Sequence, residues 1–219
     1  MPRAALVKAM IVVVASAASA QQTPVGWRWA LDRPAANVMA QDILADAWRF
    51  QEVIPGMHVT TGPGVVVLAP GDAAAGRFSV DADIVLFPDS RDSSGYGIAF
   101  GASVAAEGTE VQASTWYAFL VSGEGRYCLV RHAAGATTLL LPWQAHDAIR
   151  ARGRSTITNR LRVAVEPDSV RLIANGKPVA TVPRAGLSPD GGFGLRLDGG
   201  LNVHVTNVDI TRRLLKRTR

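Results

Sequence analysis

The stretch NRLRVAVEPDSVRLIANGKPV, residues 159–179, decides the fold class of this chain. In its first seven residues apolar and basic side chains alternate, with Leu161, Val163 and Val165 on one side and Arg160 and Arg162 on the other. A period of two residues is typical of a strand that buries one face and exposes the other. We therefore predict a half-buried β-strand here.

The dipeptide Asn175-Gly176 within the same stretch predicts a β-hairpin, because both residues tolerate the positive φ angles of a type I′ turn. The turn predicts two cross-strand pairs, Ala174 with Lys177 and Leu172 with Val179. Pro178 has no N–H to donate to a neighbouring strand, so we expect the returning strand to begin at a sheet edge.

Outward from this hairpin, strand signals recur at short intervals between turn residues, and none forms an amphipathic helix. The longest, Arg77 to Phe87, places Asp81 and Asp83 on its polar face. The others cover 57–61, 65–68, 96–101, 116–121, 126–132, 137–141, 170–174, 191–197 and 201–210. About a dozen short strands predict an all-β chain folded as a two-sheet antiparallel jelly-roll sandwich.

The first twenty residues have the three parts of a secretory signal peptide. Arg3 and Lys8 supply positive charge, residues 9–17 are apolar, and Ala18-Ser19-Ala20 offers a small-x-small cleavage site. The apolar run is shorter than the roughly 20 residues that a membrane span needs, so we expect no transmembrane segment. We expect an exported protein, periplasmic or extracellular after cleavage near Ala20.

We divide the remainder into an N-terminal arm (21–47), a β-sandwich domain (48–211) and a basic tail (212–219). Trp27 and Trp29 are expected to pack the arm onto the sandwich. Loss of Arg3 and Lys8 lowers the net charge from +5 to +3, a mild excess, and export argues against a nucleic-acid partner. The single cysteine, Cys128, sits in an apolar run and is expected to be buried and inert.

Several segments within 48–211 together resemble the concanavalin A-like lectin/glucanase jelly-roll superfamily, most closely its bacterial 3-keto-disaccharide hydrolase (3-keto-glycoside hydrolase) domains. The segments are Gly76-Arg77-Phe78, Tyr96-Gly97-Ile98, Gly125-Arg126-Tyr127 with Arg131, Trp143, Asn159 to Val163, Asn175-Gly176 and Gly192-Phe193-Gly194-Leu195. The resemblance implies a connection with glycans. It does not fix an activity, because one fold hosts many functions.

Candidates for catalysis are few. The Glu-x-Asp-x-x-Glu strand of the laminarinase-like members of that superfamily is absent from the sequence. Asp81 and Asp83 lie two residues apart on one strand face, about 7 Å from each other, and are the candidate acid and base together with His146. The alternative is that both aspartates belong to a solvated outer face.

Cofactor binding has weak signals. Asp89 and Asp92 could join Asp83 in a calcium site, but no loop shows a dense Asp-x-Asp ligand pattern, so the expected cofactor is none. None of the four histidines has a second ligand nearby in sequence, although His132 and His146 could meet at one end of the sandwich.

Aromatic residues are the candidate binding groups, because sugar rings stack their C–H faces on indole and phenol rings. We predict a platform of Tyr96, Trp116, Trp143 and His146, with Arg131 as a polar contact. The alternative is that Trp116 and Trp143 fill the core.

Three functions therefore remain open. The first is an exported, non-catalytic module that binds a carbohydrate or an envelope polymer. The second is a glycoside-active hydrolase of the 3-keto-glycoside type, and the third is a structural or protein-interaction domain.

Overall fold

The computed structural model describes residues 24–37, 47–71, 73–103 and 115–213, which form strands joined by turns and loops. Within these ranges no helix is long and apolar enough to cross a membrane. The predicted signal peptide (1–20) and most of the predicted basic tail lie outside the described residues.

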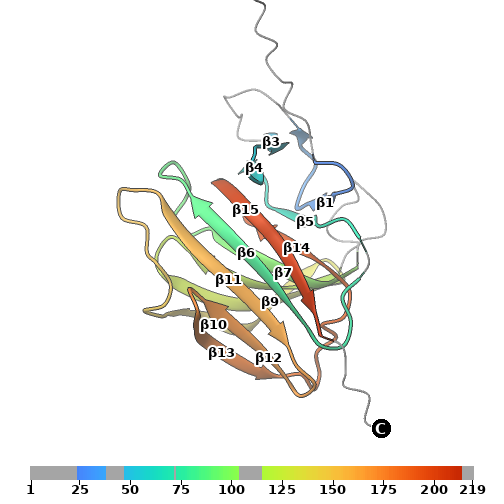
Figure 1. Cartoon of the computed structure of the whole chain (residues 1–219). Helices are drawn as coiled ribbons and strands as arrows, with labels where there is room; N and C mark the ends of the chain where they lie inside the picture. The colour runs from blue at the N-terminus through green and yellow to red at the C-terminus, as the bar shows by residue number, and fades with distance from the viewer. Residues whose placement is uncertain (1–23, 38–46, 72, 104–114, 214–219) are drawn as a thin grey trace, which may run out of the picture.

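Two sheets pack face to face, which confirms the predicted all-β jelly-roll sandwich (Figure 1). Sheet A has the strand order β1 (Arg28–Leu31), β5 (Val65–Leu68), β14 (Gly192–Leu197), β7 (Gly95–Ser103), β8 (Thr115–Ser122), β9 (Arg126–Ala133), β10 (Ala136–Ala145). Sheet B has the order β13 (Lys177–Pro183), β12 (Ser169–Ala174), β11 (Ile157–Val165), β6 (Phe78–Leu86), β15 (Leu201–Arg212), β4 (Met57–Thr61), β3 (Ala47–Glu52), β2 (Ala36–Asn37). All pairs are antiparallel except β2 with β3.

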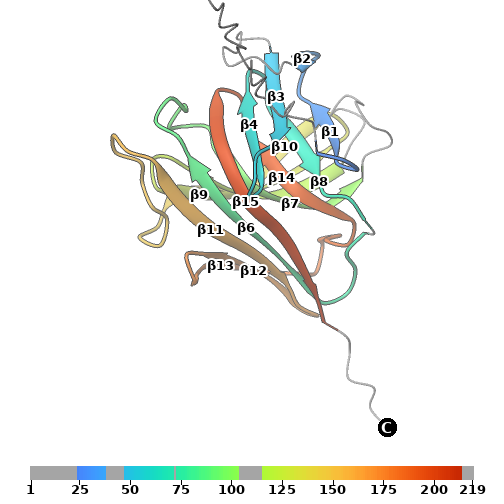
Figure 2. The same ribbon diagram turned by 45° about the horizontal axis from the view of Figure 1, so that its top comes forward.

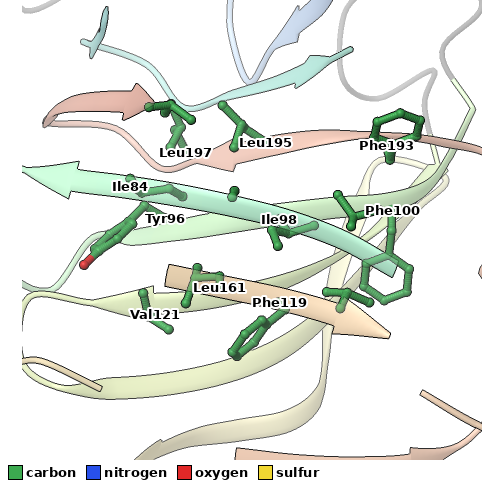
Figure 3. Packing of buried hydrophobic residues seen from close by; sticks show 14 of the residues in the cluster. Ile84, Tyr96, Ile98, Phe100, Phe119, Val121, Leu161, Phe193, Leu195 and Leu197 are labelled. Atoms are coloured by element: carbon green, nitrogen blue, oxygen red, sulfur yellow. The ribbon is translucent and has the colours of Figure 1, made fainter. Parts of the chain in front are cut away.

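The core lies between the sheets and is built by the alternation seen in the sequence. Tyr96, Ile98 and Phe100 of β7 point toward Ile84 and Leu161 of sheet B (Figure 3), and all five are fully buried. The inward positions of β11 continue with Val163 and Val165. The predicted half-buried strand is therefore confirmed, and it lies next to β6.

The Asn175-Gly176 turn is also confirmed, with φ angles of 51° and 81°. The pair Ala174–Lys177 forms as predicted, but Leu172 pairs with Ala180 instead of Val179. A register shift between Leu172 and Ile173 causes the difference, directly beside Pro178, which cannot donate to the ladder. β13 is the edge strand of sheet B, as expected from that proline.

The predicted N-terminal arm contributes two strands, β1 to sheet A and β2 to sheet B. β1 pairs with β5 at the edge of sheet A, and near it lie β3 and β4 of sheet B (Figure 2). Trp29 packs against Trp48, with ring centroids 5.4 Å apart, and Trp27 meets Phe50 edge-on at 5.8 Å. The expected packing of both tryptophans onto the sandwich is confirmed.

A buried asparagine of β11 interrupts the apolar core. The Asn159 side chain is fully buried on the inward face of β11 and uses both ends of its amide. Its Nδ2 donates to Tyr96 Oη at 2.9 Å and to the Arg150 carbonyl at 3.2 Å. Its Oδ1 accepts from Arg150 N at 3.0 Å and from Asn175 Nδ2 at 2.7 Å. Asn159 thus fixes the loop before β11 and the hairpin turn to the core.

We expect Asn159→Leu to lower the free energy of unfolding by about 3 kcal/mol, because it leaves several buried groups without partners. Tyr96→Phe removes a single hydroxyl and should cost about 1 kcal/mol. Urea denaturation of both variants and the double variant measures the coupling, expected at 0.5 kcal/mol or more. Additive effects would show that the amide and the phenol act independently.

Candidate functional site

The outer face of sheet A, which points away from the core between the sheets, carries mostly small and apolar side chains. Ala99, Ala118 and Cys128 lie there with no exposed surface, as part of a second apolar cluster distinct from the main core. Burial raises the pKa of the Cys128 thiol to about 12, with a further contribution from the charge of Asp198. The middle of this face is therefore inaccessible to solvent. The Cys128 thiol is buried as predicted, and its raised pKa disfavours the reactive thiolate.

Across this face lies a buried cation, Arg196 of β14, which is only 8% exposed. Its guanidinium donates to both carboxylate oxygens of Asp32, at 2.6 and 2.7 Å, and to Asp198 at 2.9 Å. Burial would lower the pKa of Arg196, but the hydrogen bonds and charges of the two aspartates outweigh burial and raise it. Arg196 is therefore a fixed positive charge held by two carboxylates.

Gly64 makes room for this arrangement. A Cβ at position 64 would collide with Oδ2 of Asp32 and approach Nη2 of Arg196 to 2.8 Å. The Gly62-Pro63-Gly64 segment, which lies between the predicted strands 57–61 and 65–68, thus allows Asp32 to reach the guanidinium.

Trp116 lies on the same outer face of sheet A, between the guanidinium of Arg196 and the imidazole of His132. The guanidinium carbon of Arg196 lies 5.2 Å from the Trp116 ring centroid, and His132 stacks on the indole at 4.9 Å with an interplanar angle of 8°. β14 and β9 lie on opposite sides of β8, so the two partners approach the indole from opposite sides. His132 is held in turn by Thr137, with Nδ1 and Oγ1 2.9 Å apart.

A pocket of about 580 Å³ opens at the end of sheet A, beside Trp116 and His132. Its walls come from the ends of β7, β8 and β9, from the start of β1, and from the segment that leads into β14. The lining residues are Arg28, Ala73, Gly101, Ala102, Ser103, Thr115, Trp116, Tyr117, Arg131, His132, Ser188, Asp190, Gly191 and Gly192.

Glycines shape the pocket floor. β7 is irregular at its end, where its register shifts against both neighbouring strands, and Gly101 has a φ of 59°. A Cβ at Gly101 would come within 2.7 Å of the Ser188 carbonyl, and one at Gly191 within 2.8 Å of the Gly101 carbonyl carbon. Because neither position holds a side chain, the segment before β14 lies directly on the end of β7.

The structure distributes the predicted binding residues over four places. Trp116 and Arg131 both line the pocket. Trp143 lies on the same outer face but at the other end, where a Cβ on Gly95 would approach its ring to 3.2 Å. Gly95 pairs with Ser122, six residues along β8 from Trp116, which corresponds to about 20 Å. Trp143 belongs to β10, which runs beyond the predicted strand 137–141.

The other two predicted binding residues also lie outside the pocket. The prediction for Tyr96 is wrong, because its ring is fully buried in the core and burial raises its pKa to about 12 despite the Asn159 hydrogen bond. His146 packs against Tyr127, with centroids 6.1 Å apart, at the opposite end of β9 from His132. The two histidines therefore do not meet, and the predicted four-residue platform is not formed.

The candidate acid and base lie on the outer face of the other sheet, where each aspartate has an arginine partner. Asp83 accepts from Arg160 through both oxygens, at 2.7 and 2.8 Å, and Asp81 accepts from Arg162 at 2.6 Å. The alternative of a solvated outer face, with the carboxylates held in ion pairs, describes this arrangement.

The carboxylates named for calcium also have partners. Asp92 pairs with Arg152 at 2.5 Å, and Asp89 accepts from the Asn202 amide at 2.7 Å. In the part of the chain that the structure describes, no group of three or more His, Cys, Asp or Glu side chains could hold a metal ion.

Comparison with solved structures places the fold. The carbohydrate binding module CBM66 from Bacillus subtilis matches with a TM-score of 0.56 and 14% identity, over 74% of this chain and 94% of that chain. A Bacillus subtilis protein of unknown function with a galectin-like fold matches with a TM-score of 0.56 and 14% identity, over 85% and 90%. No protein-family model and no curated protein sequence matches the chain. At these identities the likeness establishes the jelly-roll fold alone, and the 3-keto-disaccharide hydrolase resemblance stays a prediction.

Sequence reasoning did not find Arg28, Arg196 or Asp32. Each stands alone in a short apolar or turn segment, and no motif joins them to Trp116. For His132 the sequence predicts only a possible meeting with His146, not the stacking on Trp116. Its position next to Arg131 at the end of an apolar strand was the one available signal.

We expect Gly64→Ala to separate Asp32 from Arg196 and to lower the free energy of unfolding by about 2 kcal/mol, because a buried cation then loses a partner. Gly153→Ala is the matched control, since no atom lies within 4 Å of a Cβ there. Urea denaturation compares the two. Equal effects of both substitutions would contradict the role given to Gly64.

Proposed function

We propose that this chain is an exported, non-catalytic carbohydrate-binding module, and that its ligand site is the pocket at the end of β7, β8 and β9. The observation that carries the proposal is the pocket itself, which joins Trp116 and Arg131 with His132 and a rim of hydroxyl groups. The fold shared with a carbohydrate binding module supports the class of ligand. Export by residues 1–20 is part of the proposal and rests on the sequence alone.

The pocket suits a sugar through its polar rim. Ser103, Thr115 and Ser188 are exposed around it, and their hydroxyls both donate and accept hydrogen bonds, as sugar hydroxyls do. Trp116 is only 2% exposed, and His132 and Arg196 approach its ring from both sides, so its faces are not free for stacking. Recognition therefore rests on hydrogen bonds more than on the stacking platform expected from the sequence.

The carboxylates support a non-catalytic role. Glycoside hydrolysis generally needs two of them across the scissile bond. Among the described pocket residues Asp190 is the one carboxylate, and Arg184 binds it at 2.9 Å. Asp81 and Asp83 belong to the outer face of sheet B, and their oxygens accept from arginines.

Filling the pocket tests the proposal. Thr115 is exposed at the pocket rim, so Thr115→Trp should occupy the space without disturbing the core. We expect it to weaken glycan binding at least 10-fold on an array of neutral and acidic oligosaccharides, while Thr181→Trp, at an exposed position on the edge strand β13, binds as the wild type does.

Circular dichroism checks that both variants fold. Unchanged binding by Thr115→Trp would place the ligand elsewhere, and binding to no glycan would favour a protein-interaction domain. Release of sugar fragments from a bound glycan would instead indicate the hydrolase.

A further inference from the structure

The pocket carries an excess of positive charge. Arg28 of β1 and Arg131 of β9 both line it and both are exposed. Neither forms an ion pair with any residue in the described ranges, whereas Arg160 and Arg162 on the other sheet each pair with an aspartate. The charge of Asp190 is matched by Arg184. Within the described residues, two guanidinium groups without a carboxylate partner therefore line the pocket.

A third donor lies in its wall. The Nε1–H of Trp116 is buried and has no hydrogen-bond acceptor, although the residue is only 2% exposed. Buried donors are nearly always satisfied, so one left open at a pocket calls for an acceptor that the protein does not supply. An oxygen of a bound ligand is such an acceptor.

The two arginines stand far apart. Five inter-strand steps separate β1 from β9 in sheet A, about 24 Å if the sheet were flat. One carboxylate cannot bridge that distance, even with two long side chains reaching inward. A chain of sugars that carries an acid group on several rings can present a carboxylate to each arginine.

We infer that the ligand is an acidic polysaccharide built from uronic acid units, with one carboxylate bound by Arg131, another by Arg28, and a ligand oxygen accepting from Trp116. This inference rests on the proposed function, because it names the class of glycan that the same pocket takes. Guanidinium–carboxylate pairs form two parallel hydrogen bonds, which explains the use of arginine at both ends.

Matched pairs of glycans test the charge directly. Tetramers of galacturonate, mannuronate and glucuronate are each compared with their methyl esters by isothermal titration calorimetry. The ester keeps the sugar and removes the negative charge. We expect at least one acid tetramer to bind 10-fold or more tightly than its ester, and more tightly than the monomeric acid.

Variants separate the pocket from general surface charge. Arg131→Gln and Arg28→Gln should each weaken binding of the acid tetramer about 10-fold and leave the ester unaffected. Arg154→Gln is the matched control, because Arg154 is exposed in the turn before β11 and lies outside the pocket. It should bind as the wild type does.

Three results would overturn the inference. Equal affinity for acid and ester would contradict the preference for uronates, but it would remain compatible with the proposed carbohydrate binding. An equal loss with Arg154→Gln would show adsorption to a basic surface. Binding to no acid, ester or neutral oligosaccharide would overturn the proposed function as well.

Discussion

The burial of the Arg196 guanidinium is the constraint on which the outer face of sheet A depends. A charge taken out of water is tolerated only when paired and hydrogen-bonded, and here Asp32 and Asp198 supply both oxygens and charge. Asp198 also accepts from the Gly95 N–H, and its carbonyl accepts from Thr61 of sheet B. The same cation flanks Trp116 and so helps to fix one wall of the pocket.

The two outer faces of the sandwich consequently differ in chemistry. On sheet B the polar positions of β6 and β11 form cross-strand pairs of aspartate and arginine, which contribute little stability when exposed to solvent. Those pairs use the carboxylates that could otherwise act as acid and base. On sheet A the central positions are small or apolar and closed. The buried charge of Arg196 is held there by Asp32 and Asp198, while Arg28 and Arg131 line the pocket at one end.

The fold could be predicted from the sequence because its signals are local. Alternation in 159–165 and the turn at Asn175-Gly176 both operate within a few residues, and both appear in the structure. The faces of β7 and β8 could not be assigned, because both faces are buried and the alternation that marks a solvent side is absent. Tyr96 was therefore placed on the wrong face. The pocket joins residues from 28 to 192 through irregular backbone, so only Trp116 and Arg131 were foreseen.

The indole N–H of Trp116 offers the most direct measurement. The chain has five tryptophans, and each gives one indole cross-peak in a ¹⁵N–¹H spectrum, with Trp116 assigned from Trp116→Phe. Titration with an acidic tetrasaccharide should move the Trp116 signal downfield as its N–H gains an acceptor, while the Trp143 and Trp48 signals stay in place. Movement of Trp143 with Trp116 unchanged would contradict this account of where and how the protein binds its ligand.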